Sequence, residues 1–96
     1  MALMADFGEM ESYINLLNSK ADEIKKIREK IEANFEFLRN SWSGEDYDIF
    51  YNNTSEYIKN IKNVETALRN HAIDVNNKKK SYQVAVDSYW EGEKWA

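Results

Sequence analysis

A seven-residue apolar repeat runs along the chain on both sides of Gly44, and no other feature constrains the fold as strongly. In the first segment, apolar residues recur at alternating steps of three and four, and only Arg28 interrupts them. The members of this first stripe are Phe7, Met10, Ile14, Leu17, Ala21, Ile24, Arg28, Ile31, Phe35, Leu38 and Trp42. Residues three and four apart share one face of an α-helix, so the pattern predicts a long amphipathic helix. Tyr13 and Ile27 flank the stripe and widen its apolar face.

The second segment repeats this spacing, with Thr54, His71 and Lys78 as its polar interruptions. The members of the second stripe are Tyr47, Phe50, Thr54, Tyr57, Ile61, Val64, Leu68, His71, Val75, Lys78, Tyr82, Ala85 and Tyr89. A further row on one flank consists of Tyr51, Ile58, Ala72 and Val86. Neither segment alternates apolar and polar residues with period two, so the sequence predicts helices rather than strands.

The few chain-breaking residues set the expected domain organisation. Proline is absent, so long uninterrupted helices are permitted. We predict a single domain over residues 1–96, with a first helix at about 7–40, a turn at 41–45 and a second helix at about 46–89. The tail at 90–96 is expected either to fray or to depend on a partner for its order, because the apolar pattern weakens after Val75. Two helices joined by so short a link must run antiparallel.

Local signals support these boundaries. Asp6 is expected to cap the first helix. Gly44 allows the backbone to turn the corner, and Ser43 or Ser41 is expected to cap the second helix. The acidic residues that follow Gly44 would then lie in the first turn of that helix, where negative charge suits the helix dipole.

Both apolar faces are broader than a pair of helices can cover. Closing a four-helix bundle with a second hairpin is the simple solution, so the sequence predicts an all-α antiparallel hairpin that dimerises into an elongated four-helix bundle. The expected interface residues are Ile14, Leu17, Ile24, Ile31, Phe35, Leu38, Tyr47, Phe50, Tyr57 and Ile61.

Composition argues against several functional classes. The chain has no cysteine, and its single histidine, His71, lies on the apolar stripe, where a buried or half-buried packing role is expected rather than a metal site. Asp46 and Asp48 are two apart on a helix and do not face each other, so no catalytic pair is indicated and neither an enzyme nor a cofactor is expected. With 13 basic and 17 acidic residues, a nucleic-acid role is disfavoured. The apolar runs are too short for a membrane span or a cleavable signal peptide.

The central Trp42-Ser43-Gly44, between two heptad-patterned helices, resembles the turn motif of the WXG family of type VII secretion systems. Tyr89 and Glu93 are similar to the second motif of that family, a tyrosine followed four residues later by an acidic residue, which forms part of the export signal. The resemblance implies a secreted, non-enzymatic protein, made in the cytoplasm and exported without a cleavable signal peptide. Its implied partners are itself or a paralogous WXG-type chain, the export ATPase and a larger co-secreted toxin. The resemblance also implies a role as a virulence factor.

Several alternatives remain open at this level. Trp42 could serve packing alone or packing together with recognition. Arg28 and Lys78 could extend to solvent along the apolar surface, or could fix register or partner choice. The protein could act as a cytosolic adaptor that holds the helical domain of a toxin. A membrane-active effector is a third possibility, which the net charge of −4 disfavours.

Overall fold

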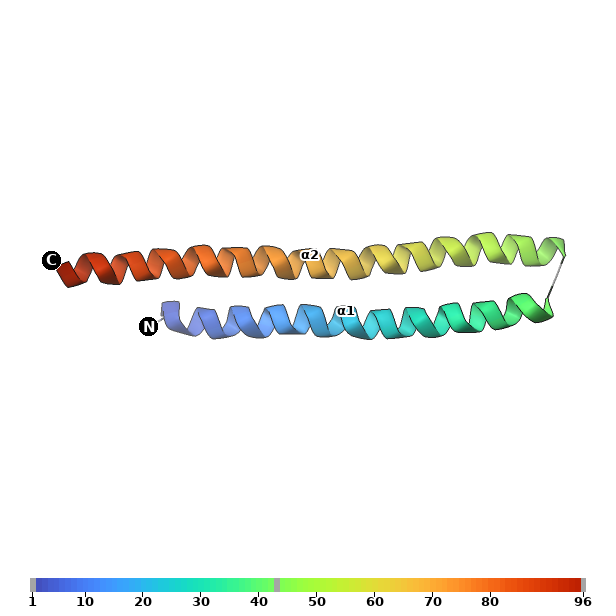
Figure 1. The fold of residues 1–96 in the computed structure, drawn as a ribbon, viewed down its shortest axis with the longest axis horizontal. Coiled ribbons are helices and arrows are strands. Elements are labelled where there is room, and N and C mark those ends of the chain that lie inside the picture. The colour runs from blue at the N-terminus through green and yellow to red at the C-terminus, as the bar shows by residue number, and fades with distance from the viewer. Residues whose placement is uncertain (1, 43, 96) are drawn as a thin grey trace.

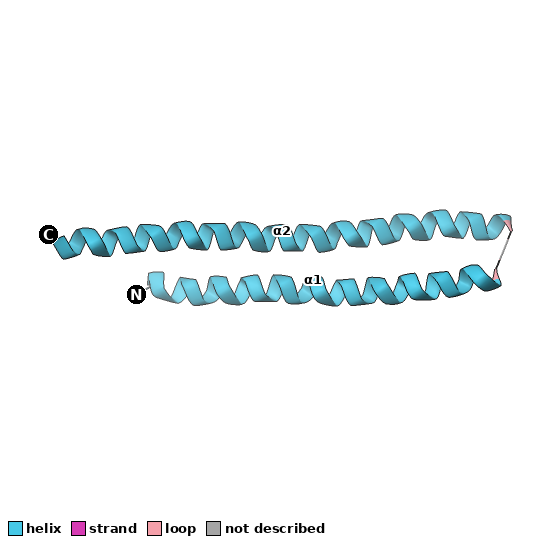
Figure 2. Ribbon diagram, viewed as in Figure 1, coloured by secondary structure: helices cyan, strands magenta, loops and turns pink. Residues whose placement is uncertain are grey.

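Two long helices that run in opposite directions make up the fold, as seen in the computed structural model (Figure 1). Helix α1 spans Ala2–Ser41 and helix α2 spans Glu45–Trp95. The described backbone contains no strand (Figure 2). The predicted all-α antiparallel hairpin is therefore confirmed.

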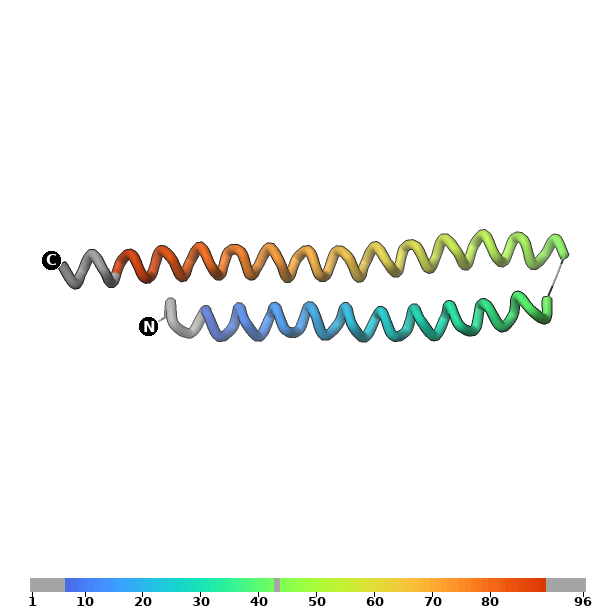
Figure 3. The backbone as a smooth tube through the Cα atoms, in the orientation of Figure 1, coloured from blue at the N-terminus to red at the C-terminus, as the bar shows by residue number. Residues whose placement is uncertain are grey.

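The hairpin is a rod. The structure describes the backbone of residues 2–42 and 44–95 and the side chains of residues 7–42 and 44–89. Figure 3 draws residues 1–6, 43 and 90–96 in grey. The principal extents are 78 × 16 × 15 Å, and the radius of gyration is 22.0 Å. A compact chain of this length would have a radius of gyration of about 12.5 Å. The longer α2 projects beyond α1 at the end where both termini lie, called here the open end (Figure 1).

Both helices extend further than the sequence pattern indicated. Asp6 lies inside α1 and does not cap it, because α1 already begins at Ala2. The Ala, Leu and Met residues that precede Asp6 are strong helix formers, and this propensity outweighs the local capping signal. At the other end, α2 continues to Trp95, where a frayed tail from residue 90 was expected. Gly92 disfavours a helix by only about 1 kcal/mol relative to alanine and removes no backbone hydrogen bond.

The turn follows the prediction at Gly44 but not at Ser41. Gly44 has a φ of 110°, a left-handed conformation that glycine adopts without steric cost. Its carbonyl oxygen accepts a hydrogen bond of 3.1 Å from the Asp48 N–H, which makes Gly44 the capping residue of α2. Ser41 Oγ instead donates to the Leu38 carbonyl oxygen at 3.3 Å, and so belongs to the end of α1. Ser43, the other predicted cap, lies outside the described residues. Glu45 and its acidic neighbours occupy the first turn of α2, as predicted.

The seam between the helices uses the predicted stripe of α1 but a shifted stripe of α2. On α1, Leu17, Ala21 and Phe35 are buried, and Ala21 has no exposed surface. Most of α2 faces α1 with the flanking row and with every second member of the predicted stripe. The half-buried or buried residues of this seam are Thr54, Ile58, Ile61, Glu65, Leu68, Ala72, Val75, Lys79, Tyr82 and Val86. The other predicted members, Tyr57, Val64, His71, Lys78 and Ala85, are exposed. Small side chains at Ala21 and Ala72 let the helices approach closely, which favours this rotation of α2.

Candidate functional site: the apolar face and the turn

One side of the hairpin carries a row of exposed apolar side chains. We call this side the apolar face and define it by Tyr13, Leu16, Ile27, Ile31 and Leu38 of α1, and Tyr57, Val64 and His71 of α2. The α1 members are spaced so that they share one side of that helix, and the α2 members recur every seven residues. A direct contact between Tyr13 and His71 places both rows on the same side of the hairpin.

Tyr13 and His71 form a polar pair within the apolar face. Tyr13 Oη lies 2.8 Å from His71 Nε2, and the two rings meet edge to face with centroids 5.5 Å apart. His71 is exposed rather than buried, because α2 is rotated away from the predicted stripe. The described residues contain no group of three or more potential ligands that could hold a metal ion.

The opposite side of the hairpin, called here the charged face, is crossed by ion pairs between the helices. Arg69 Nη2 donates to Asp22 Oδ1 at 2.7 Å, and Lys79 pairs with Glu11 nearer the open end. The hydrogen bond from Arg69 lowers the pKa of the Asp22 carboxyl. These contacts satisfy charges on this face within the single chain, so it has less need of a partner than the apolar face.

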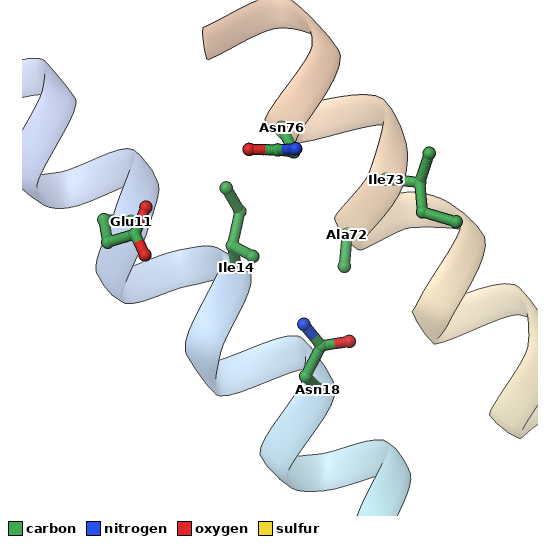
Figure 4. A pocket seen from close by; sticks show the side chains of 6 residues that line it. All are labelled: Glu11, Ile14, Asn18, Ala72, Ile73 and Asn76. Carbon is green, nitrogen blue, oxygen red and sulfur yellow. The ribbon is translucent and has the colours of Figure 1, made fainter. Parts of the chain in front are cut away.

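A small open notch lies between these two ion pairs on the charged face (Figure 4). It has a volume of about 240 Å³ and is lined by Glu11, Ile14, Asn18, Ala72, Ile73 and Asn76. The notch forms where the small Ala72 leaves space against α1. It combines amide groups with an apolar floor and presents no catalytic grouping.

A charged cluster occupies the middle of the helical seam. Arg28 Nε and Nη2 donate to the two carboxylate oxygens of Glu65 at 2.6 and 3.2 Å, and Nη1 donates to Glu32 Oε1 at 2.8 Å. Both Arg28 and Glu65 are largely covered, so Arg28 does not simply extend to solvent. Of the two alternatives, a polar seam position that fixes register is therefore supported for Arg28. Lys78, by contrast, is exposed.

The hydrogen bonds of this cluster shift the pKa values of its members. Bonding to Glu65, and next to Glu32, raises the pKa of the Arg28 guanidinium. The hydrogen bond from Arg28 lowers the pKa of the Glu65 carboxyl below its ordinary value of 4.5, although partial burial opposes this shift. A carboxyl with a lowered folded-state pKa stabilises the fold above its unfolded-state pKa. That contribution disappears as the pH falls through the lower folded-state value.

Glu65→Gln is therefore expected to lower the stability of the fold at neutral pH and to reduce the further loss of stability on acidification. We expect the midpoint of thermal unfolding to fall by roughly 5 °C or more at pH 7, because Arg28 loses a charged partner in the seam. Between about pH 5 and pH 3 the variant should lose less further stability than the wild type. Circular dichroism melts across this range test both points. Glu36→Gln is the matched control, since Glu36 pairs with Arg39 on the surface. An unchanged acid dependence in Glu65→Gln would contradict the assignment.

Aromatic rings gather at the turn end of the rod. Trp42 contacts Tyr47 and Phe50, with ring centroids 6.0 and 5.1 Å apart, and Phe35 contacts Phe50 and Tyr51 at 5.8 and 5.2 Å. Trp42 nevertheless remains 39% exposed. It therefore packs against α2 and still presents part of its ring to solvent, as packing combined with recognition requires.

The single hairpin already covers most of the residues predicted for the dimer interface. Leu17 and Phe35 are buried, and the half-buried ones are Ile14, Ile24, Tyr47, Phe50 and Ile61. Ile31, Leu38 and Tyr57 remain exposed. The predicted stripes also left out Leu16 and Glu65. Glu65 could have been noticed as an acidic residue between Ile58 and Ala72 in an otherwise apolar part of the flanking row.

The two residues predicted for the export signal lie towards the end of α2. Tyr89 is exposed on the part of α2 near the open end. The side chain of Glu93 lies outside the described residues, although the backbone of α2 is helical through both positions. Within the described helices, no segment is long and apolar enough to cross a membrane.

These features define a class: a small helical hairpin with Trp-Ser-Gly at its turn and one side left apolar. The family model described as "Proteins of 100 residues with WXG", WXG100, matches residues 2–87, so the chain belongs to this family and the sequence-based identification is confirmed. Comparison with curated proteins and with solved structures returned no significant match. Family membership supports a small secreted protein associated with type VII secretion that pairs with a WXG-type partner.

Proposed function

We propose that this protein is a non-enzymatic type VII secretion substrate or adaptor that acts as a dimer through helix-to-helix recognition. The observation that carries the proposal is the apolar face, which the two helices of one hairpin leave uncovered. Contiguous exposed apolar surface of this kind marks an interaction site.

The surface area of the chain supports a large interface. Its accessible surface is 7409 Å². A compact monomer of 11.3 kDa would expose about 5,700 Å², so the rod exposes about 1,700 Å² more. If each copy covered that excess, the interface would bury about 3,400 Å² in total, within the range of roughly 2,000–5,000 Å² for obligate homodimers.

A second copy of the chain suits the apolar face electrostatically. The few charged residues along its rim have both signs: Lys20, Glu23, Lys30, Asp74 and Lys78. Two copies can therefore meet without assembling a block of like charge, which would oppose association. We propose a homodimer that closes a four-helix bundle, with a paralogous chain as the other outcome of the test.

The recognition surface for export would be formed at the ends of this bundle. Trp42 exposes part of its ring at the turn end, and Tyr89 is exposed near the open end. Exposed aromatic side chains on rigid helices are effective binding anchors. We propose that they contact the export ATPase, and that a larger toxin, where one is present, travels with the dimer.

Two measurements on the wild type and Trp42→Ala test this function. Light scattering of the purified wild type should give about twice the chain mass of 11.3 kDa. Trp42→Ala should remain a dimer, because the apolar face is intact, but should be lost from the culture medium of the producing cell. A wild-type chain that is monomeric and retained by cells with an intact secretion system would overturn the proposal. A wild-type dimer that is retained unless a toxin is co-produced would indicate the adaptor role.

A further inference from the structure

The Tyr13–His71 pair is the one polar contact between the two rows of the apolar face. Every other member that defines this face is an apolar or aromatic residue. The 2.8 Å hydrogen bond joins α1 to α2 across residues far apart in the sequence. Neither side chain makes another hydrogen bond or ion pair among the described residues. The pair is thus a short hydrogen-bonded polar contact on a surface that is proposed to become buried, whereas the charged residues of the same rows, Lys20 and Lys78, have side chains long enough to reach solvent.

Hydrogen-bond chemistry leaves this pair with one unused donor. If Tyr13 Oη donates to Nε2, the neutral His71 ring carries its proton on Nδ1, and that N–H remains unused. If Nε2 donates to Tyr13 Oη, the phenol O–H remains unused. The conclusion does not depend on the tautomer. A partner that covers the pair must therefore supply an acceptor, or a donor is buried without one.

We propose that the Tyr13–His71 pair selects the alignment in which the second copy lies on the apolar face. This inference rests on the proposed homodimer. Apolar side chains alone tolerate sliding of one helix along another, whereas a buried polar group favours the alignments that satisfy it. Each slipped alignment that buries the unused donor would be disfavoured by roughly tenfold to hundredfold.

Acceptors for this donor are available along the same side of a second copy. On α1, Glu23 lies seven residues after Leu16, and Asn34 lies seven residues after Ile27. On α2, Asn60 and Asp74 each lie three residues after a member of the apolar face and so border its row. Such acceptors stand at fixed positions on the two helices, so only the alignments that bring one of them opposite the pair satisfy the unused donor. Polar groups placed sparsely on an apolar interface give specificity at some cost in affinity.

The test compares the alignment of the two copies with and without the pair. A single spin label is introduced at Ser19, through Ser19→Cys in a chain that has no other cysteine, and distances between labels in the dimer are measured by pulsed electron resonance. The wild-type background should give one narrow distribution. Tyr13→Phe/His71→Leu should give a broad or multiple distribution, with association as tight as or up to about tenfold tighter than the wild type. Val64→Leu, which enlarges an apolar residue of the same row, should keep the narrow distribution.

The outcomes separate this inference from the proposed function. A narrow distribution in Tyr13→Phe/His71→Leu, unchanged from the wild type, would overturn the role of the pair while leaving the homodimer intact. A wild type that shows no distance between copies would overturn both. If circular dichroism shows that the double variant has lost its helical content, Tyr13→Phe/His71→Phe is measured instead. That variant keeps two aromatic rings at these positions but has no polar group, so it should broaden the distribution, and an unchanged narrow one would count against the inference.

Discussion

Ile27→Glu is expected to convert the paired protein into a monomer. Ile27 is 56% exposed on the apolar face, beside Ile31 and in the same row as Tyr13. In a dimer closed over this face, each copy would bury one uncompensated carboxylate, and burying a charge without a partner is costly. We expect the dissociation constant to rise by about a hundredfold or more. Light scattering at a series of protein concentrations measures the effect directly.

Ile73 provides a closely matched control. It is also 56% exposed, but it lies on the charged face, at the rim of the notch beside Asn76. Ile73→Glu therefore introduces the same charge and removes the same apolar side chain on the opposite side of the rod, and should leave the dimer intact. If Ile73→Glu dissociates the protein and Ile27→Glu does not, the two copies meet through the charged face instead. If neither variant dissociates, the interface lies outside both faces.

The sequence predicted the packing of α1 because the two flanks of its stripe differ. Tyr13 and Ile27 lie on one flank, whereas the other carries Glu11, Asn18 and Lys25. Only one rotation of such a helix buries its apolar residues and leaves its charges in water. The observed burial of Leu17, Ala21 and Phe35 follows from that asymmetry.

The rotation of α2 could not be predicted in the same way, because apolar residues lie on both sides of the row that contains Ile61 and Leu68. Tyr57 and Val64 are on one side, and Ile58 and Ala72 are on the other. The apolar periodicity is therefore equally consistent with two rotations of α2 about its axis. The decision depends on how closely the backbones approach at Ala72, which is a property of the packed pair and not of one helix.

The ion pair of the seam was missed for a related reason. Arg28 was recognisable as a polar interruption, but its partner depends on the register between the helices. Glu65 lies in the row that the sequence analysis placed on the flank of the second stripe. It can be identified as the partner of Arg28 only when that row is known to face α1. The position of the turn was easier to predict, because the left-handed backbone at Gly44 is a local requirement that glycine meets best.

Phe35→Ala is expected to cause the largest loss of fold stability among substitutions of single side chains at the turn end. Phe35 is 7% exposed and contacts both Phe50 and Tyr51. Its removal leaves a cavity in the part of the rod that orders the turn, and such phenylalanine truncations cost about 3–5 kcal/mol. Urea unfolding followed by circular dichroism, at one fixed protein concentration because pairing contributes to stability, gives the difference.

Phe37 tests whether this effect comes from burial rather than from losing any aromatic residue near the turn. It lies two positions from Phe35 on the same helix but is 73% exposed. Phe37→Ala should therefore change the stability of the unpaired hairpin, measured at protein concentrations too low for pairing, by no more than about 0.5 kcal/mol. Since Phe50 contacts both Phe35 and Trp42, Phe35→Ala should also loosen the support of the Trp42 ring and reduce export, whereas Phe37→Ala leaves that chain of contacts in place. Equal losses of stability in the two variants would mean that the aromatic cluster does not hold the turn in the way its ring contacts indicate.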